Sequence, residues 1–443
     1  MAPNNDEMNR RRQRREEMRR KQEAEQKRLK TGLIIAAIVL VVCAIGLLSI
    51  IRDTGTDLAP ESQAAVATQA TKPTETQPPQ SNYSTTSTIH IKAAGDLNIT
   101  DSVVKSGVSV INGYEFTRSF IDVAPILSEA DLTVLNLEGN IVGEPYGTHR
   151  TSAPTQILEA LRSTGVDLLQ MANSCSINNG LIGLNSTLQA IHHAGMEPLG
   201  AYGSQADFQR AKGYTICEAK GIKIAFVAFT KGLGGMGLPA GSEDCVNLLY
   251  EDYDSTYKKV DTDGITRILK NVASEKPDLT VALLHWGSEG TDSHSDTQER
   301  IVNLMKKQGV DIIIGNHPHR LHRIDFDKAA GTLVAYSLGD FFGDATAGGS
   351  NYSIILDIEI TKDNQSGLTR VTDFSYTPIY TLKESDCADG KRRVVRIYPA
   401  IHAYEGNFVD SITTACYEDM KYSLGRIEQR IKGNYTGATT TAG

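Results

Sequence analysis

Histidines gather in one part of the chain, with a spacing that suits metal binding. Half of the ten histidines lie between positions 285 and 322, which include the segments 285–289 (HWGSE) and 315–319 (GNHPH). Two imidazoles that flank one residue of an extended segment project to the same side, as a chelating pair requires. The spacing of His317 and His319 therefore predicts a metal-binding loop. His192 and His193, inside a predicted helix, are expected to pack or to cap it.

Acidic and amide side chains follow other short apolar runs. Asp96 ends the segment 94–96 (AGD), Glu138 ends the segment 136–138 (NLE), and 172–175 (ANSC) follows a third run. Mixed carboxylate, amide and imidazole ligands suit zinc, manganese or iron, and such a metal can lower the pKa of bound water to about 7. Each segment alone is more often a turn or a packed strand end. The prediction of a divalent transition metal rests on their coincidence.

These segments stand where predicted strands end. Short β-branched runs predict strands at 89–93, 132–137, 166–171, 222–229, 279–284, 310–314 and 333–336. Helical patterns follow several of them, at 119–130, 154–163, 181–194, 265–274 and 297–308. This alternation predicts an α/β domain with a largely buried sheet, and functional groups collect at the strand ends of such sheets. Paired antiparallel strands (352–360 and 370–380) and an amphipathic helix (410–432) are expected to follow.

Charge and hydropathy set the N-terminal part apart from the rest. The chain carries a net charge of −8, from 45 Lys+Arg and 53 Asp+Glu, which argues against a nucleic-acid binder. Residues 1–31 form a basic arm, because the first thirty residues hold eleven Lys or Arg and six Asp or Glu. The remaining 413 residues then sum to −13. Residues 32–51 contain neither a charge nor a proline, and as a helix they would span about 30 Å, the thickness of a bilayer core.

Residues 32–51 are therefore expected to be a retained transmembrane anchor. Basic residues stay on the cytoplasmic side, so the arm would lie inside the cell and the main domain outside it. A cleaved signal peptide is the alternative, although its apolar region usually runs only about 7–15 residues. Residues 52–87, rich in Thr, Ser, Gln and Pro, predict a disordered linker. The main domain is expected at 88–404, followed by a C-terminal helix and tail at 405–443.

The motifs together match a known pattern. The segments AGD, NLE, AN, HWGSE, GNHPH and YSLGDF, in this order, resemble the capsule-synthesis CapA family, poly-γ-glutamate biosynthesis proteins with a metallophosphatase-like fold. The resemblance runs from about Thr88 to Ile360 and implies a four-layer α/β/β/α sandwich with metal ligands on loops at the strand ends. It also implies an anchored extracellular protein of a Gram-positive bacterium. The implied metal ligands are Asp96, Glu138, His285, His317 and His319, and the implied orienting residues beside them are Asn136, Asn173 and Glu289.

One segment departs from the family pattern. Where the family has an Asn-His pair, which would supply a metal ligand and a catalytic imidazole, this chain has Ser174 and Cys175, and Asn178 stands where the family has Asp. Cys175, with His285, stays a candidate catalytic group, because a thiol of depressed pKa acts as a nucleophile or metal ligand. The alternative is a small buried residue in a partly degenerate site.

Two functions stay open at this point. The chain is either a metal-dependent hydrolase that cleaves a phosphoester or γ-glutamyl amide at the cell surface, or a subunit that helps to assemble or export an anionic surface polymer. The departure at 174–175 favours the second function. The expected partners are the cell membrane, a polymer such as poly-γ-glutamate and other membrane subunits of polymer synthesis, with no nucleic acid.

Overall fold

The computed structural model describes residues 85–386, 390–398 and 412–433. The predicted basic arm, membrane anchor and nearly all of the predicted linker lie outside these residues. Within the described ranges, no helix combines the length and apolar character needed to cross a membrane.

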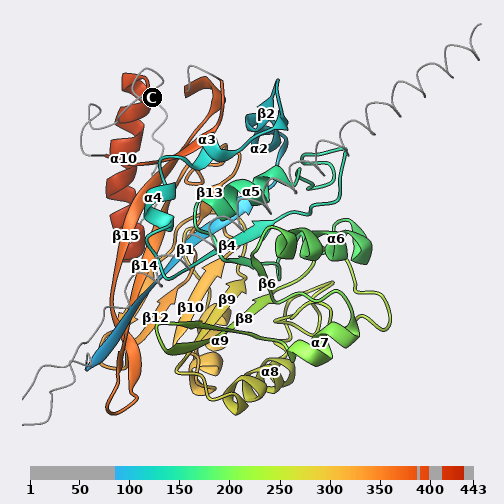
Figure 1. The fold of residues 1–443 in the computed structure, drawn as a ribbon, viewed down its shortest axis with the longest axis vertical. Helices are drawn as coiled ribbons and strands as arrows, with labels where there is room; N and C mark the ends of the chain where they lie inside the picture. The colour runs from blue at the N-terminus through green and yellow to red at the C-terminus, as the bar shows by residue number, and fades with distance from the viewer. Residues whose placement is uncertain (1–84, 387–389, 399–411, 434–443) are drawn as a thin grey trace, which may run out of the picture. The chain divides into compact units, whose positions relative to one another are not determined.

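Two mixed sheets form the centre of the described domain (Figure 1). The first sheet runs in the order β16 (Arg393–Arg396), β15 (Thr369–Leu382), β14 (Tyr352–Asp363), β1 (Thr86–Asn98), β4 (Leu132–Glu138), β5 (Leu168–Gln170) and β6 (Glu197–Leu199), with β13 (Asp340–Phe342) paired to β1. The second runs β11 (Ile324–Asp327), β12 (Thr332–Ala335), β10 (Ile312–Asn316), β9 (Leu279–His285), β8 (Ile222–Thr230) and β7 (Thr215–Ala219). A hairpin of β2 (Val108–Ser109) and β3 (Gly113–Tyr114) stands apart.

The second sheet is buried on both faces, as its nearly continuous apolar strands require. In β8, Ile224 and Phe226 belong to the core that this sheet shares with the first sheet. Ala225 and Val227 belong to a second core, shared with the helices that cover the other face. Successive residues of a strand point to opposite faces, so one strand serves both cores.

Helices pack against both sheets. Along the chain they are α2 (Asp101–Ser106), α3 (Thr117–Phe120), α4 (Ala124–Leu127), α5 (Gln156–Ser163), α6 (Gly180–His193), α7 (Gln205–Ala211), α8 (Thr262–Ser274), α9 (Asp296–Lys307), the 3₁₀ turn η1 (Glu384–Asp386) and α10 (Thr414–Ile431). Helices α8 and α9 cover the second sheet, and α10 lies along β14 and β15 (Figure 1). The order of helices, sheet, sheet and helices agrees with the four layers that the family resemblance implies.

Most predicted elements are present with shifted ends, and one is wrong. The helix predicted at 119–130 is two short helices, α3 and α4, because Pro125 lacks an amide donor and stands in the first turn of a new helix. The antiparallel pair predicted at 352–360 and 370–380 is confirmed by β14 and β15. The prediction missed short strands of two to five residues, namely β2, β3, β6, β7, β11, β13 and β16.

Candidate metal centre

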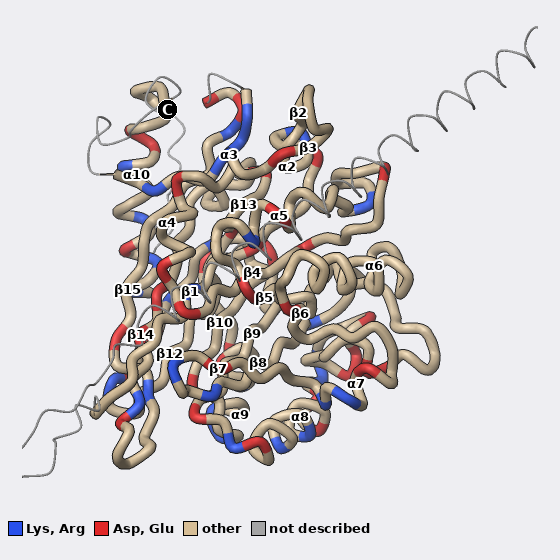
Figure 2. The backbone as a smooth tube through the Cα atoms, viewed as in Figure 1, with Lys and Arg blue, Asp and Glu red and all other residues tan. Residues whose placement is uncertain are grey.

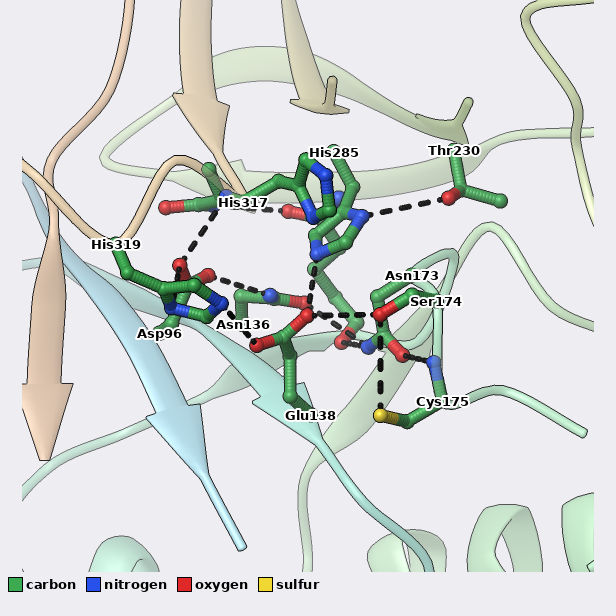
Figure 3. A network of polar contacts seen from close by, with 12 residues as sticks. Asp96, Asn136, Glu138, Asn173, Ser174, Cys175, Thr230, His285, His317 and His319 are labelled. Atoms are coloured by element: carbon green, nitrogen blue, oxygen red, sulfur yellow. Dashed lines mark hydrogen bonds and ion pairs between the residues drawn. The ribbon is translucent and has the colours of Figure 1, made fainter. Parts of the chain in front are cut away.

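The strand ends converge where the two sheets meet. Asp96 lies in β1, Glu138 ends β4 and His285 ends β9, while His317 and His319 follow β10. Figure 3 shows these five side chains turned toward one another. The strand predicted at 89–93 in fact continues through Asp96, so the carboxylate lies within the sheet and is fully buried.

Two glycines allow the backbone to come close behind the cluster. A Cβ at Gly95 would lie 1.7 Å from the carbonyl oxygen of Gly339, which accepts a hydrogen bond from the Asp96 amide at 2.9 Å. A Cβ at Gly315 would lie 2.1 Å from the carbonyl oxygen of Tyr336. Any larger residue at either position would push apart the segments that carry the clustered side chains.

The His-Pro-His segment is bent, which corrects the extended segment expected from the sequence. His317 has a φ of +98° and His319 a φ of +57°, values that side-chain-bearing residues rarely adopt. The Asp96 carboxylate accepts a hydrogen bond from the His317 amide at 3.1 Å and so helps to hold the bend. Such strained backbone persists where the surroundings fix it, and it is common at functional sites.

Ligand atoms group in three overlapping sets, each with its atoms within 4.8 Å of one another. The sets are Glu138, His285 and His317; Asp96, Glu138 and His319; and Glu289, His317 and His319. Glu138 links the first two sets, because its Oε1 lies 2.5 Å from His285 Nε2 and its Oε2 lies 3.6 Å from His319 Nε2. All five predicted ligands thus stand in one cluster, with Glu289 at its exposed edge.

Burial and mutual charge shift the pKa values of the cluster. Burial, reinforced by Glu138, raises the pKa of Asp96 well above its usual value. Burial opposes the charge of Glu138, but the His285 and His319 imidazoles outweigh it and hold the Glu138 pKa below its usual range. Burial and His285 lower the pKa of His317 to about 2. At His319, Asp340 and Glu138 outweigh the effect of burial and raise the pKa to about 11.

Two amide side chains connect the carboxylates to the segment after β5. Asn136 Nδ2 donates to Asp96 Oδ1 at 2.7 Å, and Asn173 Nδ2 donates to Asn136 Oδ1 at 3.0 Å. Asn173 Oδ1 in turn accepts from the Cys175 amide at 3.0 Å. The positions of Asn136 and Asn173 suit the orienting roles predicted for them.

Ser174 and Cys175 occupy different positions relative to the cluster. Ser174 Oγ donates to Glu138 Oε1 at 3.2 Å. Cys175 Sγ lies 3.8 Å from Ser174 Oγ and belongs to none of the three ligand sets of the described chain. Burial, reinforced by Glu138, raises the pKa of the Cys175 thiol to about 12, so the thiol stays protonated at neutral pH.

Two neighbouring residues were missed by the sequence analysis. Asp340 Oδ1 lies 2.7 Å from His319 Nδ1, and Lys231 Nζ lies 3.4 Å from His317 Nε2. Burial lowers the pKa of Lys231, an effect that Glu289 opposes. Lys231 directly follows β8, so the rule that placed the other residues at strand ends also covers it. Asp340 begins β13 instead, and the pairing of β13 with β1 brings it beside the cluster.

The side chains present fit a divalent metal. Three buried carboxylates, those of Asp96, Glu138 and Asp340, surround the single imidazole of His319. His317 Nδ1 is buried and has no hydrogen-bond partner among the described residues. Carboxylate oxygens and imidazole nitrogens form a donor set that zinc, manganese and iron accept. A cation would balance the carboxylates and supply a partner for the cluster's imidazoles.

Comparisons with known proteins identify the family. Residues 90–345 match the model of "Bacterial capsule synthesis protein PGA_cap". The capsule biosynthesis protein CapA of Bacillus anthracis is 26% identical over 242 residues, which cover 53% of this chain and 56% of that protein. The PGA biosynthesis protein CapA of Bacillus subtilis (strain 168) is 26% identical over 274 residues, which cover 59% of this chain and 67% of that protein.

Solved structures show a more distant likeness. The calcineurin-like phosphoesterase YfkN from Bacillus subtilis is 17% identical, with a TM-score of 0.41, over 77% of this chain and 99% of that one. The chain spans little more than half the length of the Bacillus anthracis relative. Because the family model covers more than half of the chain, the resemblance seen in the motifs is confirmed, and the chain belongs to the bacterial capsule synthesis protein family PGA_cap.

Proposed function

We propose that this chain takes part in the synthesis, assembly or export of poly-γ-glutamate at the outer face of the cell membrane, through a divalent metal centre in a metallophosphatase-like fold. The observation that carries the proposal is the convergence of Asp96, Glu138, His285, His317 and His319 on one buried cluster. The names of the two relatives, a capsule biosynthesis protein and a PGA biosynthesis protein, support the choice of polymer. Residues 32–51 would anchor the protein in the membrane.

The chain's own residues hold and orient the centre. Glu138, His285 and His317 would bind the metal on one side, and Asp96 with His319 on the other. When bound, the metal supplies a positive charge that attracts carboxylates and acidifies water. Such a positive charge matters here because the chain beyond the basic arm carries a net charge of −13, and a negative net charge repels a polyanion. Figure 2 shows Lys and Arg interspersed with Asp and Glu along α8 and α9 rather than gathered into a basic strip.

Binding without turnover is the function that the site supports best. A hydrolase of this kind needs a group that protonates the leaving atom. This chain has Ser174 and Cys175 where the resemblance implies Asn and His. A metal-dependent hydrolase acting on a phosphoester or γ-glutamyl amide is the second candidate. One observation favours it, a cavity of about 240 Å³ that reaches His317 and Glu289 and leaves room for a reacting group.

Replacing the two loop histidines tests the proposal. In the full-length chain, the double variant His317→Ala/His319→Ala should lose bound metal and bind poly-γ-glutamate at least 100-fold more weakly, because two imidazole ligands are gone. The matched control is His192→Ala/His193→Ala, since both residues are exposed on α6. Full metal content in the first variant would rule out this centre. Release of products from poly-γ-glutamate or from a phosphodiester by the unaltered chain would establish the hydrolase instead.

A further inference from the structure

A cavity of about 240 Å³ opens beside the candidate metal centre. Its polar and aromatic lining comes from Ser174, Lys231, Tyr257, Ser288, Glu289 and His317. His317 also belongs to two of the ligand sets, so a molecule in the cavity would touch the metal centre directly. Sites for drug-sized ligands measure about 300–1,000 Å³, which means that this cavity suits a single small unit.

Lys231 brings a positive charge to the cavity, and none of the three groups that it contacts directly among the described residues is an anion. The ammonium group donates to the carbonyl oxygen of Gly287 at 2.7 Å, lies 3.4 Å from His317 Nε2 and sits 4.7 Å from the centre of the Tyr257 ring. None of these three partners carries a negative charge. A lysine ammonium has three donors, and a partly buried charge gains most from an anionic partner.

The cavity also contains an acceptor, which limits what kind of anion it suits. Glu289 is exposed at the cavity rim, and its carboxylate repels a multiply charged phosphate while it can accept a hydrogen bond from an amide N–H. The hydroxyl groups of Ser174 and Ser288 can donate or accept. The lining therefore suits a ligand that combines one carboxylate with one amide.

We propose that this cavity binds one γ-linked glutamyl unit, with its α-carboxylate on Lys231 and its amide N–H on Glu289. In a γ-linked chain the carboxylate and the amide nitrogen are attached to the same carbon atom, so both reach one small cavity. In an α-linked chain the carboxylate lies at the end of the side chain, two methylene groups farther away. The inference rests on the proposed function and specifies the part of the site that distinguishes a γ-linked from an α-linked polymer.

Variants of Lys231 and Glu289 in the full-length, metal-loaded chain test this inference. Lys231→Met keeps the length of the side chain but removes its charge, and should weaken poly-γ-glutamate binding by about 10-fold to 100-fold in calorimetry, the usual range for a charge-assisted hydrogen bond. Glu289→Gln should reduce the preference for poly-γ-glutamate over poly-α-glutamate. Lys220→Met is the matched control, because Lys220 is exposed and pairs with Asp131 at the far end of β8.

The outcomes separate this inference from the proposed function. If the unaltered chain binds metal and poly-γ-glutamate, but Lys231→Met binds the polymer equally well with its fold and metal content intact, the cavity assignment is wrong while the function stands. Equal affinity of the unaltered chain for poly-α-glutamate, or stronger competition from inorganic phosphate than from γ-glutamylglutamate, would also overturn the assignment. If the unaltered chain binds no poly-γ-glutamate, the proposed function itself fails.

Discussion

Asp340 offers a sharp test of the metal centre, because it acts on the cluster through one imidazole. Its Oδ1 lies 2.7 Å from His319 Nδ1, while Nε2 of the same ring lies 3.6 Å from Glu138 Oε2. A carboxylate that holds one nitrogen of a ligating imidazole orients the other toward the metal, and its loss typically lowers metal affinity 10-fold to 100-fold. Asp340→Asn keeps the size of the side chain and removes its charge. We therefore expect metal binding to weaken by about 1.4–2.7 kcal/mol.

The assay compares dissociation constants in the full-length chain. Protein stripped with a chelator is titrated with Zn²⁺ or Mn²⁺ against a chromophoric competitor, and circular dichroism checks that each variant is folded. Asp325→Asn is the control. Asp325 lies on β11, where its carboxylate pairs with the guanidinium of Arg323 at 2.8 Å and does not contact the cluster. Equal metal affinity of folded Asp340→Asn and the unaltered chain would show that His319 does not bind metal through the ring orientation seen here.

Two other perturbations follow from the structure, and a third follows from the expected membrane anchor. Cys175→Ala should leave metal content and polymer binding within about twofold of the unaltered chain, because the thiol lies outside the ligand sets. A loss of hydrolytic turnover by about 100-fold would instead identify the Cys175 thiol as a catalytic group. Arg430→Ala should lower the free energy of unfolding, measured in urea, by about 3 kcal/mol. The reason is that the buried guanidinium donates hydrogen bonds to Tyr352, Leu321 and Asp292. A decrease of less than about 1 kcal/mol would contradict this. Protease added to intact cells should remove the chain beyond residue 52 and spare the basic arm, whereas soluble protein in the medium would indicate a cleaved signal peptide.

The longer strands could be predicted from the sequence because burial on both faces leaves an unbroken apolar run. The strands predicted at 222–229 and 279–284 correspond to β8 and β9, each longer by one residue. Strands of three or four residues, such as β6 and β13, carry no periodic signal of their own and form because neighbouring strands present unpaired backbone groups. Pro125 shows the opposite case, in which one residue starts a new helix and so divides the single helix that the apolar spacing had suggested.

The membership of the cluster was more predictable than its geometry. Functional groups collect toward the ends of strands in α/β sheets, so Asp96, Glu138 and His285 could be proposed as one group without coordinates, although β9 lies in the second sheet and Asp96 lies inside β1. The bend at His317 could not, because its φ of +98° depends on a hydrogen bond from its amide to a carboxylate 221 residues earlier in the chain. Asp340 was overlooked for a related reason, since only the pairing of β13 with β1 brings it beside the cluster.

Under the proposed function, the amide chain beside the cluster explains how binding can persist where the resemblance implies an Asn-His pair and this chain has Ser174 and Cys175. Asn136 holds Asp96, and Asn173 holds both Asn136 and the backbone of Cys175. These contacts fix the carboxylate and the course of the segment without using the side chain of Cys175. Ser174, the other changed residue, still donates to Glu138. Under the proposed function, the departure removes an imidazole that catalysis would need and leaves in place the contacts to the Asp96 and Glu138 carboxylates, as a site used for binding requires.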